Sequence, residues 1–143
     1  MMKLYHYTNK VNLDKILAEG LKASSRYESF TDLRKEVVFC WLSPKDQKIF
    51  GNDEICLQLT VDDSLCTVAE MDYISFAMMY KYGGAKNGGK NLPINHKASD
   101  LFVQLYETTA LPISEYDDNF FTPEVLVKGN VDAKNITIYK TSK

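Results

Sequence analysis

The sequence predicts a single small α+β domain, and three observations support this fold class. The 143 residues are the size of one domain rather than two. Apolar residues make up 45% of the chain and charged residues 25%, a composition that favours a packed core over disorder. Strand-like patterns stand near both ends of the chain, with helical patterns between them. We therefore treat residues 1–143 as one domain.

The first part of the chain predicts a strand, a helix and a loop. Residues 4–8 alternate and carry β-prone side chains, which indicates an opening strand. Apolar residues then recur at helical spacing, with Asn9 or Asn12 as the candidate N-cap and Gly20 where a left-handed C-terminal residue is expected. Residues 22–36 are polar, so we expect a long loop that contains a fragment of helix.

Two further strands are expected in the middle of the chain. Residues 37–42 form a continuous apolar run that Ser43 and Pro44 end, which is typical of a buried strand. Residues 45–50 have room for about one helical turn before a turn signal. Residues 54–61 alternate in polarity and predict the next strand.

The second half of the chain predicts one helix and two strands. Residues 70–82 suit a partly buried helix, and residues 83–97, rich in glycine and lysine, suit a flexible surface loop. Residues 101–106 fit either a helix or a strand. Residues 124–127 and 136–139 predict the last two strands. No internal repeat interrupts this order.

Charge and cysteine content exclude several classes of protein. The formal net charge of -2 argues against a dedicated basic nucleic-acid coat and a polybasic membrane anchor. No apolar run approaches the ~20 residues that cross a bilayer, and no signal peptide is apparent. Cys40, Cys56 and Cys66 have no CxxC spacing, so we expect reduced core thiols and no metal site. We expect a cytoplasmic protein with no membrane partner.

Aromatic residues are abundant, with nine tyrosines and seven phenylalanines, and some stand beside reactive groups. His6 lies within the first strand, where it could bind a sugar hydroxyl or simply a local carbonyl. Phe39 and Trp41 on one strand, with Phe50 beyond it, could stack on a flat ring or belong to the core. These aromatic positions are candidates for the wall of a binding site.

Glu124 is the third feature with chemical potential. It opens an apolar strand, where an isolated buried charge is costly, so it needs water or a partner. Glu124 could face solvent at the strand end. If it points into a cleft instead, it could bind a sugar hydroxyl or act as a general base.

Taken in order, these segments resemble the DarT-type ADP-ribosyltransferases. Residues 4–8 and residues 12–21, which read N-L-x-x-I-L-x-x-G-L, resemble the opening strand and helix of that family. Residues 39–44 are similar to its aromatic strand ending in Ser-Pro. Residues 123–131 are similar to its late strand, where E-[AV]-L-[VI] carries the catalytic glutamate. The arrangement is also similar to the wider His-Tyr-Glu class that includes the poly(ADP-ribose) polymerases.

The resemblance implies an ADP-ribosyltransferase-like split β-sheet with a few flanking helices, and NAD+ bound as substrate between its halves. The implied activity is that of a glycosyltransferase, with no metal. Glu124 would hold the nicotinamide-ribose 2′-hydroxyl and stabilise the charge that develops as nicotinamide leaves. Arg26 would bind the pyrophosphate, although Arg34 could fill the same role.

The resemblance also implies a set of NAD+-binding residues. His6 would contact the adenosine-side ribose, Tyr7 or Thr8 the nicotinamide amide, and two phenylalanines the nicotinamide ring. The full implied set is His6, Tyr7, Thr8, Phe39, Ser43 and Phe50. Phenylalanine at the aromatic positions and Tyr7 after the histidine depart from the wider class, and residues 62–118 carry no pattern of the family.

The acceptor of the ADP-ribose is left open by the sequence. DarT-type enzymes modify DNA bases, and Tyr80 or Tyr82 with nearby lysines could contact a single strand. Protein modification, a solvated lysine loop and a degenerate NAD-binding module are alternatives. A hydrolase using His6 or His96 is a further one. A toxin role would imply an antitoxin or a de-modifying hydrolase as partner. The lysines in question are Lys81, Lys86, Lys90 and Lys97.

Overall fold

The computed structural model describes residues 1–44, 54–83 and 93–139, whose strands form one seven-stranded antiparallel sheet. The strand order is β5-β4-β6-β2-β1-β3-β7, and three α-helices complete the described part, which confirms the α+β class. The strands are β1 (Met2–Asn9), β2 (Val37–Trp41), β3 (Glu54–Val61), β4 (Cys66–Glu70), β5 (Leu111–Pro112), β6 (Pro123–Lys128) and β7 (Ile136–Ile138). The helices are α1 (Lys10–Glu19), α3 (Met71–Tyr82) and α4 (His96–Thr109).

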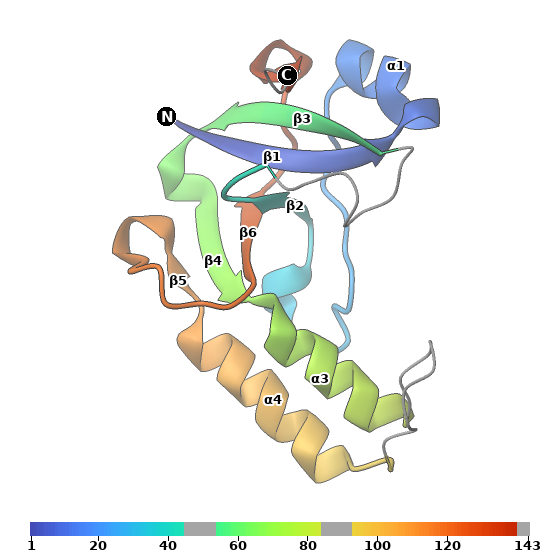
Figure 1. The fold of residues 1–143 in the computed structure, drawn as a ribbon, viewed down its shortest axis with the longest axis vertical. Helices are drawn as coiled ribbons and strands as arrows, with labels where there is room; N and C mark the ends of the chain where they lie inside the picture. Colours follow the sequence, from blue (N-terminus) through green and yellow to red (C-terminus); the bar gives the residue numbers. More distant parts are fainter. Residues whose placement is uncertain (45–53, 84–92, 140–143) are drawn as a thin grey trace.

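The sheet diverges between β1 and β2. β1 pairs with β3 along its whole length, whereas its register with β2 is limited to Tyr5 opposite Trp41. β2 and β4 both pair with β6 along their full lengths. Figure 1 shows the consequence, because β1 and β3 lie across the direction of β4 and β6. The sheet therefore has two halves, one of β1, β3 and β7 and the other of β2, β6, β4 and β5.

The main hydrophobic core joins the two halves. Alternation along each strand turns every second side chain toward this core. Ile16 of α1 and Leu21 after it close one side. The strand residues of this core are Leu4, Val38, Cys40, Leu57, Leu59, Val61, Cys66, Val68, Val125, Val127 and Ile136. A second cluster on the opposite face of β2 and β6 packs against α3 and α4 through Ile74 and Tyr106.

Helix α1 ends at a glycine for a steric reason. The amide of Gly20 donates to the carbonyl of Ile16 at 2.8 Å, and Gly20 has φ 86°. Leu21 then exchanges two backbone hydrogen bonds with Val131, each 2.9 Å long. A Cβ atom on Gly20 would lie 2.3 Å from the Val131 carbonyl oxygen, so no other residue fits without a backbone shift.

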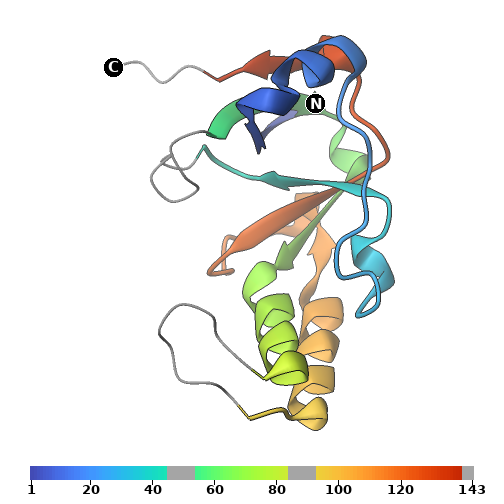
Figure 2. The same ribbon diagram turned by 90° about the vertical axis from the view of Figure 1, so that its right-hand side faces the viewer.

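Helices α3 and α4 lie antiparallel to each other, beyond the C-terminal end of β4 (Figure 2). Phe102 of α4 contacts three rings of α3, and its ring lies nearly parallel to that of Tyr80 with centroids 5.7 Å apart. Asn95 caps α4 by accepting the Ala98 amide at 3.0 Å. Residues 101–106 are therefore helical, and the expected loop at residues 83–97 is wrong at His96 and Lys97, which begin α4.

Two strands were not expected from the sequence, β4 and the two-residue β5. β4 lies between β5 and β6, and Glu70 belongs to it rather than to the helix predicted for residues 70–82. Helix α3 follows with no intervening glycine or proline, so the sequence carries no boundary signal. The helical turn predicted for residues 45–50 lies outside the described residues. Within the described ranges, no helix has the length and apolarity to span a membrane.

Replacing Gly20 tests the closure of α1. We expect Gly20→Ala to lower the free energy of unfolding by about 3 kcal/mol, because alanine tolerates this backbone poorly and its Cβ meets the Val131 carbonyl. Gly129→Ala is the matched control, since Gly129 has a similar φ of 82° with nothing within 4 Å of the added Cβ. It should cost about 1 kcal/mol. Equal losses in denaturant unfolding would contradict the steric explanation.

Candidate functional site

A cavity of about 550 Å³ opens where β1 and β2 diverge. Its walls come from β1, α1, the segment after α1, β2 and the start of β6, and its size is ordinary for a small-molecule site. Most of the residues that the sequence analysis predicted as site residues line it. These are His6, Tyr7, Thr8, Arg26, Phe39 and Glu124.

Ser43, a further predicted residue, is not part of this lining. Ser43 lies two residues beyond the end of β2, where its side chain is exposed. Phe50 lies outside the described residues. The cavity is therefore lined by the predicted residues of β1, the loop after α1, β2 and β6, but not by Ser43.

Glu124 is held in a buried ion pair at the edge of this cavity. It is the second residue of β6 and lies opposite Trp41 of β2 and Ala69 of β4. Its Oε1 atom is 2.5 Å from Nη1 of Arg34, and the two side chains are only 7% and 3% exposed. Such a pair is stabilising only with good geometry and further hydrogen bonds, because both charges have left water.

Further hydrogen bonds fix the Arg34 guanidinium. Nη1 donates to the Tyr106 hydroxyl at 3.0 Å, and Nε donates to the Arg26 carbonyl at 3.0 Å. Burial alone would lower the pKa of Arg34, but the Glu124 carboxylate and the Tyr106 hydroxyl outweigh it and raise the pKa. Arg34 is therefore a permanent cation, and it connects the loop before β2 to α4 and β6.

The path of the loop after α1 explains how Arg34 reaches Glu124. Ser24 and Val37 exchange backbone hydrogen bonds of 2.9 Å, so the loop between them closes on itself. Tyr27 turns the chain with a φ of 56°, a value that residues other than glycine seldom adopt. Thr31 then caps a short 3₁₀-helix, Asp32–Arg34, by accepting the Leu33 amide at 3.3 Å. Arg34 ends this helix and points inward.

The second carboxylate oxygen of Glu124, Oε2, has different surroundings from Oε1. Oε2 forms no hydrogen bond with any residue in the described ranges, although the side chain is nearly buried and lines the cavity. Buried polar atoms are almost always hydrogen-bonded. Within the described ranges, the structure assigns Oε2 no hydrogen-bond donor.

His6 has a defined tautomer. Its Nδ1 lies 2.7 Å from the Phe39 carbonyl oxygen, which can only accept, so Nδ1 carries the proton. Burial lowers the pKa of His6 from its usual value of 6.5, the Phe39 carbonyl partly offsets this, and the Arg26 charge lowers it further. At neutral pH the imidazole is uncharged, so Nε2 is a hydrogen-bond acceptor. The same contact bridges β1 and β2 beyond their registered pair.

Phe39, which lines the cavity, also packs against two arginines. The Arg34 guanidinium lies 4.5 Å from the centre of its ring and that of Arg26 lies 5.8 Å away, so cations pack against this phenylalanine. Trp41 also lines the cavity and lies directly opposite Glu124. The structure thus separates the two arginines, because Arg26 lines the cavity while Arg34 is buried behind Glu124.

Sequence reasoning missed two parts of the site. Asn12, Lys15, Ile16 and Glu19 line the cavity from α1, and their i, i+3, i+4, i+7 spacing marks one helix face. The spacing of these four residues is visible in the sequence and could have indicated this face of the helix. Tyr106, by contrast, is fully buried on α4, and nothing in its sequence neighbourhood indicates a partnership with Arg34.

Two of the four lysines predicted to follow nucleic-acid phosphates lie within the described residues, and neither lines this cavity. Lys81 and Lys97 line a separate cavity of about 560 Å³ beside α4. Asp100 and Glu107 line it as well, so its charge is mixed. The other two predicted lysines, Lys86 and Lys90, lie outside the described residues.

The cysteines form no disulfide among the described residues, and no cluster there could hold a metal ion. Burial raises the pKa of the Cys66 thiol to about 11 and raises that of Cys40 as well. Both thiols are therefore protonated and unreactive at neutral pH.

The chain matches no family model, no curated protein and no solved structure. Its function has to be inferred from the residues and geometry of this cavity.

A double-mutant cycle tests the buried ion pair. We expect Arg34→Met to lower the free energy of unfolding by about 3–5 kcal/mol, because it leaves the Glu124 carboxylate buried without its cation. Adding Glu124→Gln removes that charge and should restore part of the loss. Denaturant unfolding of the two single variants and the double variant measures the coupling, and strictly additive losses would show that the two side chains do not interact.

A second test concerns His6 and pH. Because its pKa is lowered in the folded state, the unfolded chain binds more protons between that value and 6.5. The contribution of His6 to the free energy of unfolding should be fully present above about pH 6.5. It should be lost as the pH falls through the lowered pKa.

The variant His6→Asn is the reference for this test, because its amide can still donate to the Phe39 carbonyl but does not titrate. Urea unfolding of both proteins at about pH 8 and about pH 5 gives the difference. We expect the wild type to lose more stability than His6→Asn on acidification. A constant difference between the two proteins would mean that the pKa of His6 is not lowered.

Proposed function

We propose that this protein is an ADP-ribosyltransferase, which cleaves NAD+ at the nicotinamide–ribose bond and transfers ADP-ribose to a macromolecular acceptor. The observation that carries the proposal is the environment of Glu124. Its Oε1 is paired with Arg34, and Glu124 lines the same cavity as His6 and Arg26. A fixed carboxylate in a partly dry cleft is what the departure of a neutral leaving group from a sugar carbon requires.

The proposed fold is an ADP-ribosyltransferase-like split sheet. Two features favour it over an ordinary antiparallel sheet: β1 and β2 share one registered pair, and the cavity lies at that divergence. NAD+ would lie across the divergence, with its nicotinamide end near Glu124 and its adenosine end near His6.

In the proposed reaction, the bond between the ribose C1′ and the nicotinamide nitrogen breaks, and its electron pair leaves with nicotinamide. The ribose acquires oxocarbenium character, which Glu124 stabilises while Oε2 accepts a hydrogen bond from the 2′-hydroxyl. The acceptor nucleophile then bonds to C1′, and Glu124 takes its proton as general base. Electrostatic stabilisation of this kind is worth ~3–4 kcal/mol per group.

The other residues bind and orient the dinucleotide. His6, uncharged with Nε2 as acceptor, suits a ribose hydroxyl. Arg26 suits the pyrophosphate because it lines the cavity. Tyr7 and Thr8 would hold the nicotinamide amide, largely through their backbone groups. Phe39 is proposed to orient the two arginines, because their guanidinium groups lie against its ring.

The acceptor is proposed to be a nucleic-acid base or a protein side chain. The mixed charge around Lys81 and Lys97 gives no support for tight, sequence-independent nucleic-acid binding. A single strand that reaches the cleft only briefly, as in a DarT-like toxin, needs no such surface. The role of an antitoxin or a de-modifying hydrolase as partner belongs to this same proposal.

A second candidate function is NAD+ binding without catalysis. The Arg34 ion pair favours it, because it occupies one of the two carboxylate oxygens of Glu124. This candidate predicts saturable NAD+ binding with no release of nicotinamide, in the presence or absence of acceptors.

The decisive test compares the wild type with Glu124→Gln. We expect the wild type to release nicotinamide from NAD+ and the variant to do so at least about 100-fold more slowly, because the amide cannot offset the developing charge. Glu115→Gln is the control, since Glu115 is an exposed glutamate on a 3₁₀-helix away from the cavity. NAD+ binding, measured by calorimetry, should survive in both variants.

The same reactions identify the acceptor. Single-stranded DNA, RNA and a protein extract are each incubated with NAD+ and the wild-type protein, and mass spectrometry then looks for the mass of ADP-ribose. A nucleic-acid adduct supports the DarT-like reading, and a protein adduct supports the alternative. Binding of NAD+ without nicotinamide release or adduct would leave only the second candidate.

A further inference from the structure

Glu70 binds the backbone of the segment just before Glu124, and the proposed reaction gives Glu70 no role. It is the last residue of β4 and is 3% exposed. Its Oε1 accepts the Phe121 amide at 2.9 Å and its Oε2 accepts the Thr122 amide at 2.7 Å. No lysine, arginine or histidine of the described ranges forms an ion pair with it. Both oxygens of this buried carboxylate thus accept hydrogen bonds from neighbouring backbone amides.

The backbone on both sides of this contact is also fixed. The Phe120 amide donates to the Tyr116 hydroxyl at 3.3 Å, so three consecutive amides before β6 are bonded to side chains. The Thr122 carbonyl accepts the Met71 amide at 3.0 Å. Together these contacts determine the path of residues 120–122, which end two positions before Glu124.

Proline explains why β6 needs such a contact. Pro123, the first residue of β6, lies opposite Glu70 and has no amide proton to donate to a neighbouring strand. The strand therefore starts without a donor at its first position. The Glu70 carboxylate supplies two bonds immediately upstream, so it replaces the missing anchor.

We propose that Glu70 is a positioning residue for Glu124, an inference that rests on the proposed ADP-ribosyltransferase function. Glu70 fixes the start of β6 so that the Glu124 carboxylate meets Arg34 through Oε1 and keeps Oε2 toward the cavity. It acts through the backbone of residues 121–124 and does not touch the substrate. A shift of the glutamate by about 1 Å at such a site can cost a large factor in rate.

The variant Glu70→Gln tests this with little change of shape. One oxygen is replaced by an amide group, which cannot accept a backbone N–H, so one of the two bonds is lost. We expect kcat for nicotinamide release to fall about ten-fold while KM for NAD+ changes less than about two-fold. Glu70→Asp, which keeps the charge but has a shorter reach, should show a smaller loss of kcat.

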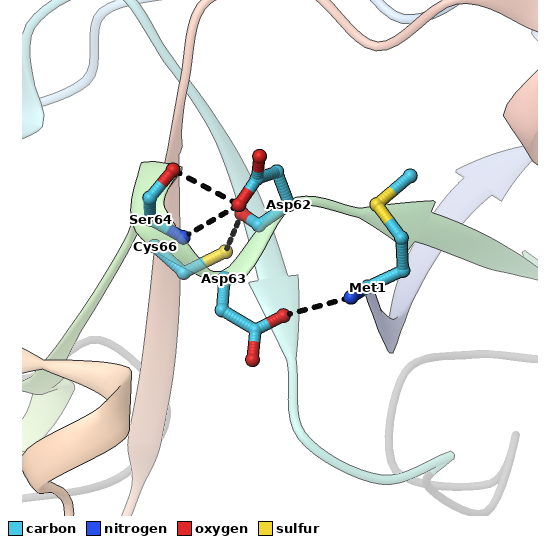
Figure 3. Close-up of polar contacts among 5 residues, drawn as sticks. All are labelled: Met1, Asp62, Asp63, Ser64 and Cys66. Atoms are coloured by element: carbon cyan, nitrogen blue, oxygen red, sulfur yellow. Dashed lines mark hydrogen bonds and ion pairs between the residues drawn. The ribbon is translucent and has the colours of Figure 1, made fainter.

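Asp62 provides a matched control at the other end of the same strand. Its Oδ1 accepts the Ser64 amide at 3.0 Å and the Ser64 hydroxyl at 2.9 Å, on the exposed turn that leads into β4 (Figure 3). Asp62→Asn therefore removes a carboxylate that binds a backbone amide, as Glu70→Gln does, but far along β4 from Glu124. It should leave kcat and KM unchanged.

A second measurement does not depend on activity. Hydrogen exchange of the Arg34 guanidinium protons, followed by NMR, reports on the ion pair with Glu124. In Glu70→Gln these protons should exchange several-fold faster than in the wild type, and in Asp62→Asn they should not. Thermal unfolding of each variant shows whether the change is global.

The outcomes separate the two proposals. If the wild type releases no nicotinamide, the proposed function fails, and the Arg34 exchange alone decides whether Glu70 positions Glu124. If the wild type is active but Glu70→Gln keeps its kcat and its Arg34 exchange rate, only the positioning role is overturned. A lower melting temperature with unchanged kcat would also overturn it, because Glu70 would then be purely structural.

Discussion

The buried ion pair between Arg34 and Glu124 is the constraint on which the rest of the site depends. Two charges removed from water cannot be tolerated unless each is paired and the remaining hydrogen-bonding groups are satisfied. The Arg34 guanidinium meets this demand through Tyr106 of α4 and the Arg26 carbonyl of the loop. One interaction thereby ties the loop before β2, the helical hairpin and the sheet together, and it leaves one oxygen of Glu124 without a protein partner among the described residues.

The second determinant is the divergence of β1 from β2. If β1 and β2 were hydrogen-bonded along their whole length, the sheet would be continuous here and would leave no room for a ligand between the two strands. The register stops at Tyr5 opposite Trp41, and the His6 contact to the Phe39 carbonyl then holds the two strands across the gap. The same contact fixes the imidazole tautomer. The cavity and the chemistry of one of its walls therefore have a common structural origin.

Sequence patterns predicted the strands around this site better than the contacts within it. Alternation revealed β1 and β3, and an apolar run revealed β2, because each has a face that must be buried. Residues 66–70 gave no such signal, since β4 passes into α3 without a breaking residue. Spacing could not show that Arg34 pairs with Glu124, because the path of the loop through the turn at Tyr27 brings the two side chains together. Tyr106 depends on tertiary packing alone.

In the proposed function, NAD+ binds where β1 and β2 diverge, with its nicotinamide ribose against Glu124. The most direct measurement is a crystal structure of the protein in complex with NAD+ or a non-hydrolysable analogue. We predict the ribose 2′-hydroxyl within hydrogen-bond distance of Glu124 Oε2, with Arg34 still paired to Oε1 and Arg26 near the pyrophosphate. An NAD+ molecule bound elsewhere, or an empty cavity at saturating ligand, would contradict this account.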